Sequence, residues 1–186
     1  MRKFALATVL ALAAFGATAA EVKLEAQNSV GQNGTADQQV YEFGLKEKIN
    51  NNFAGDVVVK NYRTDGTDVL STRYEAGITA SNTYGLFSPY TRVAIGEKTT
   101  SGSAGYGYYS VEPGVAVPLT AFPGTTVQLG YRYQDAFANG HSDLTRTWRS
   151  KLGYDINGTN NVYIGYDSQR GDSSANIVKA GYVHKF

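Results

Sequence analysis

The chain has 186 residues, a mean hydropathy of −0.31 and a formal net charge of +1. It contains no cysteine, which excludes disulfide bonds, cysteine-ligated zinc and a cysteine nucleophile. The near-zero charge gives no reason to expect nucleic-acid binding, and no apolar run is long enough for a transmembrane helix.

Residues 1–20 have the organisation of an export signal. Arg2 and Lys3 form a basic start, residues 4–15 are mostly apolar, and the segment ends in Ala-Thr-Ala-Ala. This order of regions is typical of a cleaved secretory signal peptide, and we expect the cut after Ala20. A membrane anchor is the alternative, but the apolar run is too short to span a bilayer. Cleavage removes two of the 17 basic residues and none of the 16 acidic ones, which leaves a net charge of −1.

From Glu21 onward, apolar and polar residues alternate, with turn residues at short intervals. Alternation at every second position is typical of a β-strand with one apolar face. The pattern predicts about ten strands, with eight or twelve as alternatives. In chain order, the alternating segments are 21–27, 41–46, 53–62, 70–79, 87–95, 108–117, 127–134, 147–156, 162–167 and 178–186.

Polar, glycine-rich connections separate these segments. Asn157-Gly158 is the strongest hairpin signal among them. Pro89 and Pro113 fall inside strands and predict bulges or strand ends. The connections after odd strands are mostly the longer ones, as in barrels with long outside loops and short periplasmic turns, and an even strand count places both mature ends on the periplasmic side. Loops are expected at 29–37, 97–105, 138–143 and 171–175, and turns at 50–52, 64–68, 81–83 and 119–124.

The fold class that we predict is all-β, a closed antiparallel transmembrane β-barrel over residues 21–186. A soluble barrel would also show alternation, so the alternation alone does not decide between them. The export signal and the aromatic residues near the ends of the apolar stripes favour the membrane, because aromatic girdles mark the two interfaces. These aromatic residues are Tyr41, Phe53, Phe87, Tyr109, Tyr133, Tyr154, Tyr166 and Tyr182.

The last predicted strand carries a resemblance to a known family. Val178, Ala180, Tyr182 and the terminal Phe186 lie on one face. A terminal phenylalanine that closes an alternating strand resembles the C-terminal signature of bacterial outer-membrane β-barrel proteins. The resemblance implies an outer-membrane location in a Gram-negative bacterium and recognition by the barrel-assembly machinery. His184 departs from the apolar residue that is usual two positions before the end.

The polar face is expected to surround a lumen with 11 bases and 8 acids, an excess of three positive charges. Charged rings in a narrow pore set ion preference. The predicted mid-lumen residues are Lys60, Arg73, Glu75, Arg92, Glu112, Arg132, Arg149 and Lys151. This basic lining is similar to that of the oligogalacturonate porins, small channels for acidic oligosaccharides with about twelve strands. Inward glycines either leave the wall bare or provide room for inward tyrosines.

These features predict a small porin for passive diffusion of ions and small anionic solutes. The alternative is a closed structural or surface-binding barrel whose loops contact lipopolysaccharide or a partner. The expected partners are outer-membrane lipid, lipopolysaccharide, the assembly machinery and small solutes, with no nucleic acid. We expect no enzyme activity, cofactor or metal: the one histidine beside a serine and an acid is His141, and adjacent residues rarely form a working triad. The oligomeric state is left open.

Overall fold

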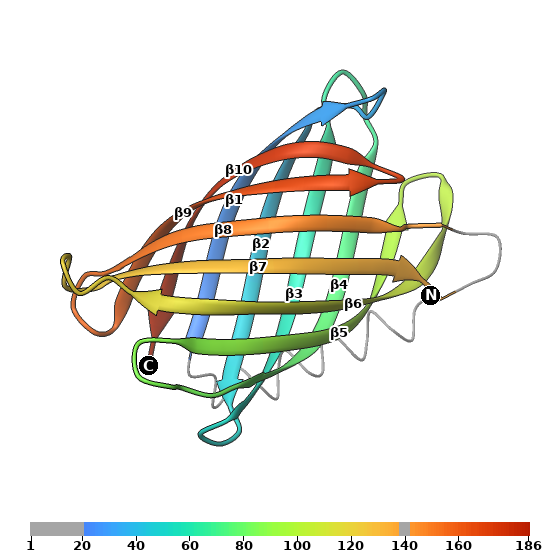
Figure 1. Ribbon diagram of the computed structural model, residues 1–186. Helices are drawn as coiled ribbons and strands as arrows, with labels where there is room; N and C mark the ends of the chain where they lie inside the picture. The colour runs from blue at the N-terminus through green and yellow to red at the C-terminus, as the bar shows by residue number, and fades with distance from the viewer. Residues whose placement is uncertain (1–20, 138–141) are drawn as a thin grey trace.

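The computed structural model describes residues 21–137 and 142–186, so the predicted export signal and His141 lie outside the described residues. Within these ranges the chain forms ten strands. Each pairs antiparallel with its neighbours in sequence, and β10 pairs with β1 to close a barrel (Figure 1). The strands are β1 Glu21–Gln32, β2 Gln38–Lys48, β3 Phe53–Thr64, β4 Leu70–Ser81, β5 Ser88–Thr100, β6 Ser103–Pro118, β7 Thr125–Ala136, β8 Thr145–Asp155, β9 Asn160–Gly171 and β10 Ser174–Lys185.

The two faces of the wall differ in the way that the alternation predicts. On β9, Ile164 is 61% exposed on the outer face, whereas Tyr163, next to it, and Asp167, three residues further on, are buried inside. On β10, Val178 is 62% exposed and Lys179 is 3% exposed. Soluble proteins rarely expose contiguous apolar surface on this scale. Each large apolar side chain gains about 1.5–3 kcal/mol on leaving water, so lipid is the environment in which this outer wall is stable.

The described part of the chain contains no helix that is both long and apolar enough to cross a membrane.

Inward glycines provide room for inward tyrosines. Gly96 lies opposite Tyr108 across the β5–β6 pair, and a Cβ atom at Gly96 would lie 2.6 Å from Cζ of Tyr108. Gly114 has the same relation to Tyr90 on the same pair of strands. Contacts this close leave no space for another side chain. Of the two expectations for these glycines, close packing against tyrosine is therefore the one observed at both positions.

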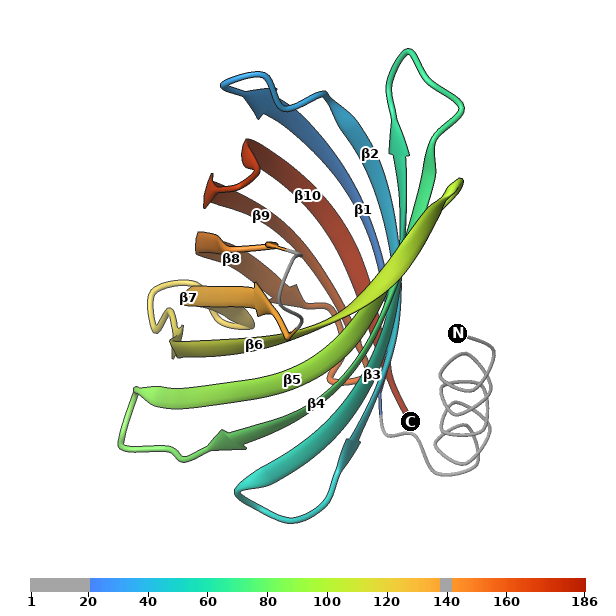
Figure 2. The same ribbon diagram turned by 90° about the vertical axis from the view of Figure 1, so that its right-hand side faces the viewer.

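Several strands extend beyond the segments that alternation predicted. The predicted loop 97–105 is a continuous hairpin, in which β5 and β6 are joined by residues 101–102 alone. The predicted loop 171–175 is likewise reduced to residues 172–173. The ends of the β3–β4 and β5–β6 hairpins project beyond the wall in Figure 2. Backbone pairing continues into water where an apolar face is no longer required, and β-branched residues such as Thr99 favour it.

The expected asymmetry in connection length is therefore wrong. The short connections 101–102 and 172–173 lie at the end of the barrel opposite the described chain ends, whereas residues 82–87 and 119–124 connect strands at the other end. Paired strand extensions replace two of the loops that were expected on that side, 97–105 and 171–175.

The two prolines are placed where the sheet tolerates them. Pro89 is the second residue of β5. Pro113 pairs with Thr91, but on the β7 side the pairing stops after Val111 and resumes at Gly114 in the same register. Pro113 has no backbone N–H to donate, and it lies where the β6–β7 pairing is interrupted.

Candidate functional site: the barrel lumen

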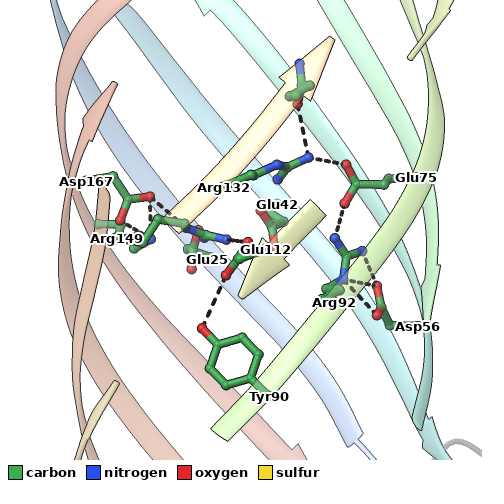
Figure 3. Close-up of polar contacts among 12 residues, drawn as sticks. Glu25, Glu42, Asp56, Glu75, Tyr90, Arg92, Glu112, Arg132, Arg149 and Asp167 are labelled. Atoms are coloured by element: carbon green, nitrogen blue, oxygen red, sulfur yellow. Dashed lines mark hydrogen bonds and ion pairs between the residues drawn. The ribbon is translucent and has the colours of Figure 1, made fainter. Parts of the chain in front are cut away.

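Inward side chains from every strand meet inside the barrel and form three charged clusters. The Glu75 cluster joins the five consecutive strands β3 to β7, and most of its members are labelled in Figure 3. Arg92 donates from Nε to Asp56 at 2.9 Å and from Nη1 to Glu75 at 2.6 Å. Glu75 also accepts a hydrogen bond from Arg132 and one from the Tyr108 hydroxyl at 3.1 Å. The Glu75 side chain is 2% exposed, so its charge depends on these partners.

The Asp167 cluster lies on the opposite part of the wall and joins β6, β8, β9 and β10. Arg149 donates to Glu112 at 2.6 Å and to Asp167 at 3.1 Å (Figure 3). Lys179 donates to the same Asp167 carboxylate at 2.6 Å. Arg149 therefore bridges strands that are not neighbours in the sheet.

The Glu42 cluster joins β1, β2, β3 and β9. Glu42 pairs with Lys60 at 2.7 Å and with Lys23. Lys23 also lies 3.4 Å from Glu25, which accepts a hydrogen bond from the Tyr163 hydroxyl. Together the three clusters form a layer of paired charges across the lumen, which we call the charged layer.

A loop residue caps the charged layer at the end away from the described chain ends. Asp143 is the last residue of the loop expected at 138–143, and its side chain is buried and accepts a hydrogen bond from Arg73 at 3.3 Å. The Arg73 guanidinium lies over the rings of Tyr62 and Tyr108, at 5.2 and 5.4 Å from the centroids. Asp143 folds inward because Arg73 and Gln134 both donate to it.

Two cavities lie on either side of the charged layer. One of about 400 Å³ opens toward the chain ends, and one of about 130 Å³ lies toward the Asp143 loop. Lys60, Arg132 and Arg149 border both cavities, so the layer separates them. All the predicted mid-lumen residues except Arg73 border the larger cavity, and Arg73 borders the smaller one.

Two inward lysines differ from the other cations bordering these cavities. Among the described residues, no carboxylate lies within ion-pair distance of Lys151 or Lys98. Lys151 borders the larger cavity with its Nζ 4.9 Å from the centre of the Tyr163 ring, and Lys98 borders the smaller one. In addition, Nε of Arg73 and Nε of Arg132 are buried and have no acceptor in the described chain. The lumen therefore offers unused cationic donors.

Gln134, Tyr108 and Asp143 complete the polar contacts, but none of them is among the predicted mid-lumen residues, and Tyr108 was expected only as an inward tyrosine. Gln134 and Tyr108 carry a detectable signal, because both occupy inward positions two residues from another polar inward residue. Asp143 carries none, because a loop has no period from which to infer its direction.

In the loop that precedes β8, Ser142 and Asp143, which follow His141 in the sequence, each have a side-chain partner. The Ser142 hydroxyl donates to Asp172, and Asp143 is held by Arg73 and Gln134. Across the residues described, no group of three or more histidine, cysteine or acidic side chains is arranged to hold a metal.

The predicted assembly signal lies on one outward face of β10. Val178, Ala180, Tyr182 and Phe186 are all exposed there. The His184 ring packs edge-on against Phe186, with 4.6 Å between centroids, and its Nδ1 lies 2.9 Å from the Asn160 side-chain oxygen. Recognition of this face by the assembly machinery stays a prediction.

No protein-family model and no curated protein matches the sequence. Solved structures do match. The NanC porin has a TM-score of 0.60 at 13% identity, with 89% of this chain and 100% of that chain covered. The β domain of the Bordetella autotransporter BrkA has a TM-score of 0.55 at 13% identity, covering 89% and 98%. The KdgM porin has a TM-score of 0.52 at 11% identity, covering 89% and 99%.

At sequence identities of 11–13%, these matches show a shared fold and do not show a shared function. The matched proteins are outer-membrane β-barrels, small porins among them. The closed antiparallel barrel and the apolar outer wall agree with that class. The chain has the fold of the outer-membrane β-barrels, as its last strand and its alternation predicted.

Proposed function

We propose that this barrel is a small outer-membrane porin of low conductance, which passes ions and small anionic solutes. The observation that carries the proposal is the set of unused cationic donors along the lumen. Lys151 borders the larger cavity and Lys98 the smaller one, and among the described residues neither has a carboxylate within ion-pair distance. An anion that moves between the cavities would thus meet an ammonium group without a carboxylate partner on each side of the charged layer.

The charged layer accounts for the low conductance. Its carboxylates are each held by a cation on another strand, so a solute passes only where side chains move aside. The larger cavity has room for several hydrated groups, since a water molecule takes about 30 Å³. Side chains attached to the wall move far more readily than a folded plug, so the layer is a narrow resistance in the pathway.

The comparisons give the proposal a context. Two of the matched folds are described as porins, and KdgM has been solved in complex with disordered oligogalacturonate, an acidic oligosaccharide. A basic excess in the present lumen suits the same charge class of solute. The narrower ten-stranded wall limits the size of that solute.

Changing Lys151 to glutamate tests the proposal. In planar bilayers under a salt gradient, the wild type should conduct with a reversal potential that indicates anion preference. K151E replaces the unpaired cation with an anion beside the larger cavity, so the reversal potential should shift toward cation preference. Arg63 lies on the outer face of β3, so R63E makes the same charge change outside the lumen and should leave the reversal potential unchanged. Equal reversal potentials for wild type and K151E would contradict anion selection by this residue.

A closed surface-binding barrel is the second candidate. The observation that favours it is the burial of the layer, in which the side chains of Glu42 and Glu75 are each 2% exposed. A folded wild-type barrel with no conductance at any voltage would support this candidate and refute the porin. Deletion within residues 65–69 or 142–144 would then reduce binding to the cell-surface partner.

A further inference from the structure

Two arginines on the outer wall face each other without a counter-charge. Arg146 in β8 and Arg170 in β9 are direct cross-strand partners, and both side chains are exposed. Like charges in this arrangement destabilise a sheet. Among the described residues, neither guanidinium has a carboxylate within ion-pair distance, and Arg170 donates only to the backbone carbonyls of Gln169 at 2.6 Å and Ala175 at 3.5 Å.

Two acids lie near the arginine pair in sequence and register: Asp172 is two residues from Arg170, and Asp135 is two residues from Tyr133, the β7 partner of Arg146. Asp172 accepts from the Ser142 hydroxyl and from the Leu144 backbone N–H at 2.8 Å. Asp135 accepts from the Ala136 backbone N–H at 2.8 Å and from the Tyr133 hydroxyl at 3.4 Å. Neither carboxylate lies within ion-pair distance of Arg146 or Arg170, so the arginine pair can bind an anion from outside the chain.

The wall changes from charged to polar to apolar below the arginine pair. Ser168 is two residues from Arg170 and lies between Trp148 on β8 and Asn176 on β10. The Asn176 Oδ1 atom is buried and has no hydrogen-bond donor in the described chain. Trp148, at the level of Ser168, is 68% exposed, and Tyr166 and Val178, which pair with each other further along the wall, are 47% and 62% exposed.

We propose that Arg146 and Arg170 bind a phosphate-bearing headgroup of a membrane lipid. Guanidinium groups bind phosphate oxygens in pairs of parallel hydrogen bonds, and two of them together match a doubly charged phosphate. The acyl chains of the same lipid would lie along the exposed side chains of Trp148 and Val178. The arrangement fits a ligand that is anionic at one end and apolar at the other.

The end of the barrel at which the arginine pair lies indicates which membrane lipid it meets. Arg146 is the second residue of β8, and Arg170 is the last but one of β9, so both lie at the end of the barrel away from the chain ends. In barrels of this architecture the chain ends are periplasmic and the opposite end faces outward. The leaflet at that end carries lipopolysaccharide, whose lipid A moiety bears phosphate, so lipid A phosphate is the ligand that we assign.

The single tryptophan of the chain provides the readout. Trp148 lies two residues from Arg146 on the same face and is the only tryptophan in the sequence. Diphosphoryl lipid A titrated into the protein in neutral detergent micelles should shift the tryptophan emission in a saturable way. The R146Q/R170Q variant should bind at least about tenfold more weakly, and R146K/R170K should lie between the two, because it keeps the charge and loses the paired hydrogen bonds.

Controls separate the lipid from other anions and the site from general charge. R63Q removes an outer-wall arginine that faces Gln39 instead of a second arginine, and its lipid A affinity should equal that of the wild type. Inorganic phosphate and dephosphorylated lipid A should give no saturable shift at the same concentrations. Equal affinity of wild type and R146Q/R170Q would overturn the proposal. Saturation by inorganic phosphate alone would overturn the assignment to a lipid. Circular dichroism and heat-modified gel mobility verify that each variant is folded.

Discussion

Replacing Glu75 with alanine should lower the free energy of unfolding of the barrel by about 3–5 kcal/mol, because it leaves two buried guanidinium groups without their shared carboxylate. The Glu75 side chain is 2% exposed, and those of Arg132 and Arg92 are 11% and 15% exposed, so bulk water screens the loss poorly. The Tyr108 hydroxyl loses its acceptor in the same variant. Urea unfolding of the protein in lipid vesicles measures the effect.

A double-mutant cycle separates the pairing from the loss of side-chain volume. In E75A/R132A the unpaired Arg132 charge is gone and Arg92 keeps Asp56, so a part of the lost stability should return. E21A is the matched control, because Glu21 lies 3.7 Å from Lys46 at the rim with a half-exposed partner, and such pairs contribute about 0–1 kcal/mol. Equal losses for E75A and E21A would show that the charged layer has no structural role.

Replacing the whole Glu75 cluster by serine should raise the single-channel conductance several-fold. The variant D56S/E75S/R92S/R132S removes two acids and two bases, so the net charge of the lumen is unchanged. Arg132 borders both cavities, and its removal together with its partners should join them into a wider path. Conductance in planar bilayers at fixed salt measures the change.

The rim offers a control of the same composition. Glu21 pairs with Lys46 at 3.7 Å and Asp155 with Lys185 at 3.8 Å, both near the chain ends. Changing these four residues to serine also removes two acids and two bases, but outside the charged layer. Its conductance should stay close to that of the wild type. If the D56S/E75S/R92S/R132S variant had the same single-channel conductance as the rim variant, the charged layer would not be the part of the lumen that limits conductance.

The direction of each side chain could be predicted from sequence because it follows from a period of two residues. Ile164 and Asp167 lie on the faces that alternation assigned, and the same holds for Val178 and Lys179. Strand ends could not be predicted in this way. The apolar signal stops where the wall leaves lipid, whereas backbone pairing continues to Thr100.

The pairing inside the lumen could not be read from the sequence. Alternation says that Glu75 and Arg132 both point inward, but these residues are 57 positions apart and lie on strands that are not neighbours. Their contact depends on the curvature and stagger of the closed sheet. The burial of Asp143 depends in the same way on Arg73, 70 positions earlier.

The central claim is that the apolar residues of each strand contact acyl chains while the charged ones enclose an aqueous interior. The chain has no cysteine, so single cysteines with spin labels can be placed on β9 without background. In lipid vesicles, labels at Ile164 and Tyr166 should collide mainly with oxygen, which concentrates in the bilayer. Labels at Tyr163 and Asp167 should collide mainly with a water-soluble nickel complex. The opposite pattern at the four positions would mean that the charged face is outside. That result would contradict both the charged lumen and the proposed porin function.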